Sequence, residues 1–166
     1  LQVIGQYMQG VHGGLDACLD DAARAPLDRV RRFFEMTQTH YRSEGYMGCL
    51  LGGLGQELSG VNATFRRTID QCLSHIAERI AGCLEEARIR GDIAADANPR
   101  HLAGLLVDCW EGAALRSRLQ RSPAPLQAML DQARRVTLTS RAFRNDQLPL
   151  FYKEIHELTG FDMVLP

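Results

Sequence analysis

The chain has 166 residues, of which 45% are hydrophobic and 23% are charged, a balance typical of a single globular domain with a substantial core. Its 19 Lys and Arg residues nearly match its 20 Asp and Glu residues, so the composition predicts no nucleic-acid binding by this chain itself. Its five cysteines are odd in number and lack CxxC spacing, which argues against both a disulfide framework and a zinc site.

Apolar residues recur at helical spacing along most of the chain, and no convincing strand pattern of period two stands out. This spacing predicts helices over 1–23, 27–43, 47–58, 62–90, 99–120 and 124–139, followed by a short amphipathic segment near 151–158. The sequence therefore predicts an all-α bundle of six or seven helices. Because the first residues already look like a helix interior with no capping residue before them, we also expect the chain to be an excerpt of a longer protein.

Particular residues mark the ends of the two longest predicted helices. Either Ser59 or Asn62 would cap the helix over 62–90, and Gly91 would end it. Asn98, which a proline follows, is a start signal for the next helix.

The segment EGYMGCLLGGLGQELSG, residues 44–60, combines a single cysteine with four glycines within positions 48–55. In a helix these four glycines would together cost about 3–4 kcal/mol relative to alanine. Gly48, Gly52 and Gly55 would fall nearly on one helix face, which predicts the close approach of a neighbouring helix. Such a short helix would also be free to shift or unwind when a ligand arrives.

No pattern in the sequence indicates catalysis or metal binding. Cys49 would need a neighbouring histidine and acid to act as a nucleophile, and the candidates His40 and His75 lie on other predicted helices. The histidines and carboxylates are scattered, and no HExxH motif is present. We therefore predict no enzyme activity, no catalytic residue, no metal site and no cofactor.

Aromatic and sulfur-containing side chains recur on several predicted helices. Core packing explains any one of them, but helices interrupted by glycines can leave space between them for an apolar ligand. Candidates for the polar groups of such a site are Thr37, His40, Gln56 and Glu111.

Three stretches together resemble the C-terminal regulatory domain of TetR-family transcriptional repressors: YMGCLLGGLGQELSG, FRRTIDQCLSHIAERIAGCLEEARIRGDI and ANPRHLAGLLVDCWEGAALRSRLQRSPAPLQAML. The resemblance covers about residues 1–138 and is nearest to members with a Gly-Cys-Leu-Leu-Gly helix. It implies a domain over 1–139 that binds a small inducer and forms a homodimer, while 140–166 is an unassigned extension. Operator DNA would be bound only by an N-terminal helix-turn-helix that is missing from this chain.

In this family the inducer pocket lies among the earlier helices and the start of the helix over 99–120. The candidate ligand-binding residues are Tyr7, Phe33, Thr37, Cys49, Leu50, Gly53, Trp110 and Glu111. In some relatives the cysteine after the first glycine of this pattern reacts with electrophiles, so Cys49 is also a candidate reactive cysteine.

The last two helices of the domain carry wide apolar stripes and small residues. The resemblance implies that they form a four-helix bundle with a second copy, and the candidate dimerisation residues are Leu102, Leu106, Ala113, Leu126, Leu130 and Ala133. Alternatively, both stripes belong to the core of a single chain.

Two alternative functions remain open: a helical interaction module without a small ligand, and a cysteine-based electrophile or redox sensor. A filled core near Cys49, Phe33 and Trp110 would favour the interaction module. The sequence has no signal peptide and no apolar run long enough to cross a bilayer, so we expect a cytoplasmic protein without membrane contact.

Overall fold

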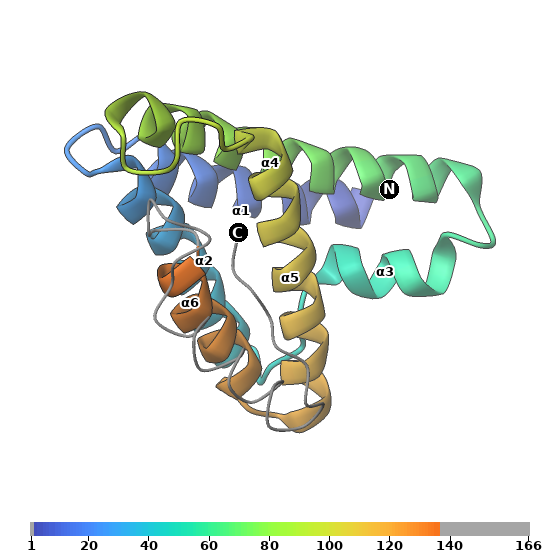
Figure 1. Cartoon of the computed structure of the whole chain (residues 1–166). Helices are drawn as coiled ribbons and strands as arrows, with labels where there is room; N and C mark the ends of the chain where they lie inside the picture. The colour runs from blue at the N-terminus through green and yellow to red at the C-terminus, as the bar shows by residue number, and fades with distance from the viewer. Residues whose placement is uncertain (1, 137–166) are drawn as a thin grey trace, which may run out of the picture.

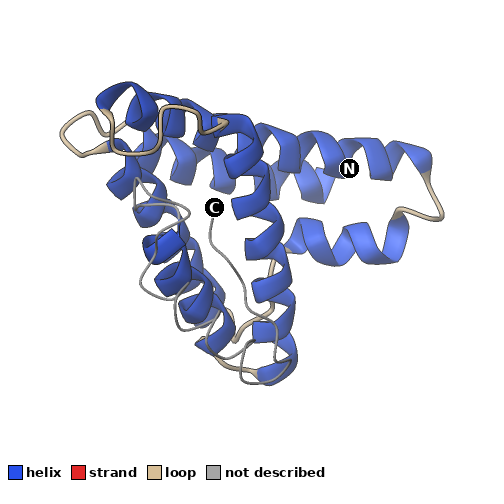
Figure 2. Cartoon of the chain, in the orientation of Figure 1, coloured by secondary structure: helices blue, strands red, loops and turns tan. Residues whose placement is uncertain are grey.

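The structure, a computed structural model of the chain, describes residues 2–136. Within that range the chain forms no strand and six α-helices (Figures 1 and 2): α1 (Gln2–Leu19), α2 (Pro26–Ser43), α3 (Leu50–Leu58), α4 (Ala63–Arg90), α5 (Pro99–Gln120) and α6 (Ala124–Val136). The prediction of an all-α fold is confirmed. The segment near 151–158, the extension over 140–166 and the side chain of Ala133 lie outside the described residues.

Helix α4 is the longest helix and contacts four of the others. In Figure 1, α1 runs beside it along the upper edge, α3 lies below its N-terminal half, and α5 descends from beside its middle. Helices α2 and α6 pack side by side on the opposite flank from α3. Helices α1, α2, α4 and α5 therefore surround a common interior.

The predicted helix ends are confirmed where side chains or glycine define them. The Asn62 side chain caps α4 by accepting hydrogen bonds from the backbone N–H groups of Thr64 and Phe65 at 2.9 and 3.1 Å. Gly91 ends the same helix in the left-handed conformation, with φ of 80°. Asn98 caps α5 in the same way as Asn62 caps α4.

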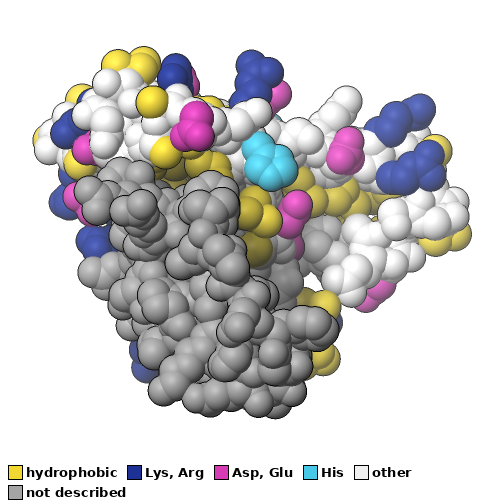
Figure 3. Space-filling model, in the orientation of Figure 1, with side chains coloured by type: hydrophobic (Ala, Val, Ile, Leu, Met, Phe, Trp, Pro, Cys, Tyr) yellow, Lys and Arg dark blue, Asp and Glu magenta, His cyan; other side chains and the backbone are white. Residues whose placement is uncertain are grey.

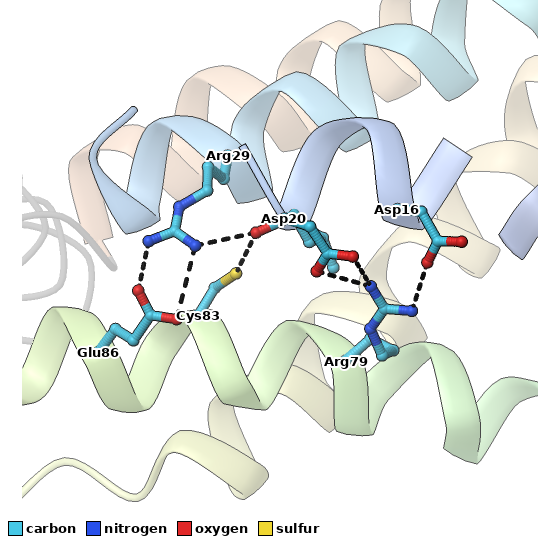
Figure 4. A network of polar contacts seen from close by, with 7 residues as sticks. Asp16, Asp20, Arg29, Arg79, Cys83 and Glu86 are labelled. Carbon is cyan, nitrogen blue, oxygen red and sulfur yellow. Dashed lines mark hydrogen bonds and ion pairs between the residues drawn. The ribbon is translucent and has the colours of Figure 1, made fainter. Parts of the chain in front are cut away.

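Polar contacts fix the place where α1 ends. The helix stops at Leu19 rather than near residue 23, because Asp21 turns the chain by accepting a hydrogen bond from the Ala23 N–H at 3.2 Å. The buried guanidinium of Arg29 donates to the Leu19 carbonyl at 2.9 Å and also pairs with Glu86 of α4 (Figure 4). These contacts join the end of α1 and the start of α2 to the C-terminal part of α4.

A second ion-pair cluster joins α1 to α4 about two turns away along α4 (Figure 4). Arg79 of α4 donates to Asp16 at 2.8 Å and to Asp20 at 2.9 Å. Because all three side chains are accessible to water, this cluster sets the register of the two helices more than it adds stability.

Helix α3 is shorter than predicted. It begins at Leu50 with Cys49 as its N-terminal cap residue, whereas Gly48 lies before it in the left-handed region with φ of 79°. Gly48 is therefore a turn residue and does not share a helix face with Gly52. The close approach predicted for Gly52 is confirmed, because a Cβ atom there would collide with the carboxylate of Glu111 on α5.

The buried side chains form two groups. The larger group lies among the second half of α1, α2, the second half of α4, α5 and α6. The smaller group consists of Ile4, Met8, Leu51 and Ile69. Partly buried side chains that pack against both groups are Val11, Cys49, Leu73 and Ile76. These four side chains connect the two parts of the core.

Most residues predicted to form a dimer seam lie in the core of the single chain. The larger buried group includes Leu106, Ala113, Leu126 and Leu130, and Leu102 packs half-buried against it. Apolar periodicity marks a covered face without specifying which chain covers it, so the part of these residues in a dimer seam stays a prediction. The apolar side chains of α5 that are exposed are Leu105, Leu115 and Leu119.

The visible surface carries charges of both signs in a scattered arrangement (Figure 3). No helix in the described part of the chain combines the length and the apolarity that a bilayer crossing requires.

Candidate functional site

A cavity of about 520 Å³ lies where α1, α2, α4 and α5 meet, with the N-terminal cap residue of α3 at one corner. Small-molecule sites in proteins have volumes of this size. The cavity is lined by Gln6, Tyr7, Gly10, Val11, Gly13, Gly14, Ala17, Phe33, Phe34, Met36, Thr37, His40, Tyr41, Cys49, Ile76, Val107, Trp110 and Glu111.

The cavity is open on the side where α1 faces α2. Gln6, Gly10 and Gly13 of α1 and Met36 and His40 of α2 line the cavity and are exposed to solvent. A Cβ atom on either glycine would meet no other atom within 4 Å. The glycines that weaken the helical pattern of α1 therefore leave this side of the cavity unobstructed.

Four aromatic rings form a continuous wall on the buried side of the cavity. The ring centroids are 5.6 Å apart for Phe33 and Phe34, 4.8 Å for Phe34 and Trp110, and 6.1 Å for Tyr41 and Trp110. All four side chains are buried, and these separations are typical of favourable aromatic pairs. Their packing gives the cavity a rigid apolar wall.

Three polar side chains meet at the corner near α3. The hydroxyl of Tyr7 lies 3.6 Å from Sγ of Cys49, and the carboxylate of Glu111 is close enough to raise the pKa of that thiol. No basic side chain among the described residues pairs with Glu111, and the lining described for the cavity contains no Lys or Arg. The corner therefore holds one acidic group and no compensating cation.

Burial disfavours the charged forms of the ionisable groups of this corner. It raises the pKa of Cys49 to about 11, and the nearby Glu111 carboxylate adds to this effect. Burial likewise raises the pKa of Glu111 and, together with Cys49, the pKa values of Tyr7 and Tyr41. At neutral pH, Cys49 is therefore a thiol rather than a nucleophilic thiolate.

Six of the eight predicted ligand-binding residues line this one cavity: Tyr7, Phe33, Thr37, Cys49, Trp110 and Glu111. Leu50 and Gly53 do not, because α3 begins after Cys49 and directs its first turn to a shallower adjoining groove. Gln56 is also outside the cavity and lies in a groove between α3 and α5. The role of the six residues in binding stays a prediction.

Apart from Tyr7, the sequence prediction missed the part of the lining that α1 contributes. The signal that could have revealed it was the presence of three glycines in an otherwise regular helical pattern: Gly10, Gly13 and Gly14. Gly14 also permits contact between α1 and α2, since a Cβ atom there would collide with the methyl group of Met36.

The polar groups near Cys49 lack the base that a nucleophilic site would need. No histidine lies within hydrogen-bond distance of Cys49 in the described part of the chain, and its raised pKa opposes nucleophilic attack. Among residues 2–131, no three His, Cys, Asp or Glu side chains come together as a metal site requires.

The chain is similar to known transcriptional regulators. The chain matches the family described as "Tetracyclin repressor-like, C-terminal domain" over residues 26–133. It is 36% identical to the transcriptional regulator AcuR of Cereibacter sphaeroides over 115 residues, which cover 69% of this chain and 52% of that protein. It is 26% identical to the HTH-type transcriptional repressor DhaR of a Mycobacterium species over 129 residues, which cover 78% and 64% of the two proteins.

A solved structure is also similar. The crystal structure of regulatory protein TetR from Rhodobacter sphaeroides superposes with a TM-score of 0.75 at 33% identity, covering 79% of this chain and 70% of that one. The chain spans about half to two thirds of the length of these curated regulators.

A short match to an enzyme also occurs. The chain is 59% identical to ornithine aminotransferase of a Geobacillus species over 46 residues, which are 28% of this chain and 12% of the enzyme. Such a small share of the enzyme does not carry its activity, whereas the regulators match most of the chain.

Proposed function

We propose, from the premise that the chain belongs to the family of tetracyclin repressor-like C-terminal domains, that it senses a small molecule on behalf of a transcriptional regulator. The observation that carries this proposal is the cavity of about 520 Å³, which has an aromatic wall and an opening between α1 and α2. A domain that only joined two proteins would have no need of such a cavity in its core.

The position of the cavity indicates how a ligand would act. Val11, Cys49 and Ile76 line the cavity and also pack against both buried groups. A ligand that fills the cavity therefore changes the spacing between the two parts of the core, which include opposite halves of α1. In the whole protein, a shift of α1 would reach a DNA-binding domain placed before it, and ligand and operator would then affect each other's affinity reciprocally.

The whole regulator is proposed to be a homodimer that binds operator DNA through a helix-turn-helix outside this chain. Support for the dimer comes from α5, whose exposed side chains Leu105, Leu115 and Leu119 recur along one face. Support for the DNA-binding segment comes from the length of the relatives, of which this chain covers only a part.

An electrophile sensor based on Cys49 is less well supported. A sensor cysteine needs a depressed pKa, whereas burial and Glu111 raise the pKa of this thiol. We therefore propose that Cys49 is part of the cavity lining and binds ligand without forming a covalent bond.

The single tryptophan of the chain allows a direct test, because Trp110 lines the cavity. A library of small apolar molecules would be screened for quenching of Trp110 fluorescence and for a rise in melting temperature. Gly10→Leu narrows the cavity opening, whereas Gly5→Leu is a matched control on an exposed part of the same helix. We expect hits that bind the control protein normally and bind the Gly10→Leu variant weakly; hits that bind both variants equally would overturn the proposal.

A further inference from the structure

We propose that the cavity selects organic cations, namely compact ammonium ions that carry an apolar body. The inference rests on the proposed function, since it names the class of ligand that the same cavity takes. Two features of the lining carry it: a half-buried carboxylate without a basic partner, and a wall of four contiguous aromatic rings.

The carboxylate is Glu111 of α5. Burial of a carboxylate is unfavourable unless a charge or hydrogen bonds compensate it, and no basic side chain of the described residues forms an ion pair with the half-buried Glu111. α3 passes directly over this group, because Gly52 has no Cβ atom to collide with it. A positive charge on the ligand would therefore supply the partner that the carboxylate of Glu111 lacks.

The aromatic wall is suited to the same ligand. The faces of tryptophan, tyrosine and phenylalanine attract cations, and the attraction increases where water is excluded. Phe33, Phe34, Tyr41 and Trp110 are all buried, and Tyr7 adds a fifth ring beside Glu111. An ammonium group near Glu111 would thus place its apolar substituents against the rings.

The lining disfavours anionic ligands and is less suited to uncharged ones. An anionic ligand would meet neither Lys nor Arg among the described lining residues and would lie near a carboxylate. An uncharged ligand could use the aromatic wall but would leave Glu111 without a partner. Burial raises the pKa of Glu111, and a cation bound beside it would lower that pKa and favour the ionised form.

Three probes of similar shape and different charge distinguish these classes. They are benzyltrimethylammonium, the uncharged 2,2-dimethyl-3-phenylpropan-1-ol and the anionic 2,2-dimethyl-3-phenylpropanoate. Each is titrated into the chain while Trp110 fluorescence is recorded, and affinities are checked by calorimetry. We expect the ammonium ion to bind about tenfold or more tightly than the alcohol, and the carboxylate to bind more weakly than both.

Three variants test whether the carboxylate of Glu111 determines the preference for the ammonium ion. Glu111→Gln should weaken ammonium binding to the level of the alcohol and leave alcohol binding unchanged. Asp108→Asn removes an equal charge from an exposed position of the same helix and should keep the wild-type preference. Gly52→Ala, which displaces the Glu111 carboxylate without removing it, should weaken ammonium binding in part and serves if Glu111→Gln does not fold.

The outcomes separate this inference from the proposed function. If the alcohol or the carboxylate binds as tightly as the ammonium ion or more tightly, the proposed cation preference is overturned, while the cavity remains a ligand site. Failure of all three probes to bind, together with no hit in the wider screen, overturns both. Ammonium binding that survives Glu111→Gln unchanged also overturns the assignment, because it removes the carboxylate from the recognition.

Discussion

Glu111 illustrates a residue whose position is unfavourable for stability and useful for binding. Its carboxylate lies beside an aromatic wall, and no basic side chain of the described residues compensates it. Binding sites often retain such groups, since the ligand supplies the compensation that the empty protein lacks. The same residue should therefore limit the stability of the ligand-free domain.

We expect Glu111→Gln to stabilise the ligand-free chain at pH 7. Because burial raises the pKa of Glu111 in the folded state, the wild type gains protons on folding and loses stability as pH rises from about 4.3 through that raised value. Glutamine has no such loss, so the advantage of the variant should shrink toward pH 4.5. His40, Cys49, Tyr7 and Asp108 are common to both proteins, so their contributions largely cancel. Melting temperatures between pH 4.5 and 8 provide the measurement, and a variant that is less stable at pH 7 would contradict this account.

Cys49 should react slowly with electrophiles although it lines the cavity. With a pKa of about 11, about 0.1% of the thiol is ionised at pH 8, and access is also restricted. We expect iodoacetamide to modify the exposed Cys109 first at pH 8 and Cys49 only as the pH approaches 11, as followed by mass spectrometry of peptides. Glu111→Gln should speed modification of Cys49 at pH 8, because it removes a negative charge that raises this pKa. Equal rates for the two cysteines at pH 7 would instead revive the electrophile sensor.

At the scale of the element, the sequence predicted what local chemistry determines. Asn62 and Asn98 were recognised as caps because their side chains bond to backbone N–H groups two and three residues away. The start of α3 was missed because Gly48 has a left-handed backbone conformation. It packs there against Ala114 and Arg118 of α5, which are far away in the sequence. Long-range contact decides such a turn, and the glycine alone does not reveal it.

Two of the three glycines of α3, Gly52 and Gly55, should respond differently to alanine. A Cβ atom on Gly55 would meet Ile69 at an ordinary 3.6 Å, so Gly55→Ala should stabilise the chain by about 1 kcal/mol. A Cβ atom on Gly52 would displace the Glu111 carboxylate, so Gly52→Ala should gain less or nothing. Urea unfolding of both variants gives the comparison. Equal stabilisation would show that Glu111 moves aside without cost.

The joint between α1, α2 and α4 should depend on Arg29. Arg29→Met removes a hydrogen bond to the Leu19 carbonyl and the pairing with Glu86, and we expect a loss of about 2–3 kcal/mol. Arg24→Met removes an exposed pair with Asp21 and should cost less than about 1 kcal/mol. Unfolding midpoints in urea measure both losses. A loss of similar size in the two variants would mean that Arg29 contributes no more than a surface pair.

At the scale of the molecule, the sequence located the cavity better than the dimer face. Phe33, Cys49 and Trp110 were grouped because aromatic and sulfur side chains beside glycines leave room for a ligand. Leu106 and Leu126 were placed at a partner surface although the chain buries them itself, since periodicity identifies a covered face but not the element that covers it. The candidates for the partner surface are instead the apolar side chains that the single chain leaves exposed.

The exposed face of α5 therefore carries the prediction about assembly. Leu105→Glu combined with Leu115→Glu should convert a dimer into a monomer, because each charge would be buried without a partner at the seam. The fold should survive, since both side chains are at least a third exposed in the single chain. Val61→Glu changes an exposed apolar residue far from α5 in the sequence and should leave the dimer intact. Light scattering at micromolar concentration measures the mass, and a wild-type monomer, or a double variant that remains dimeric, would show that α5 is not the seam.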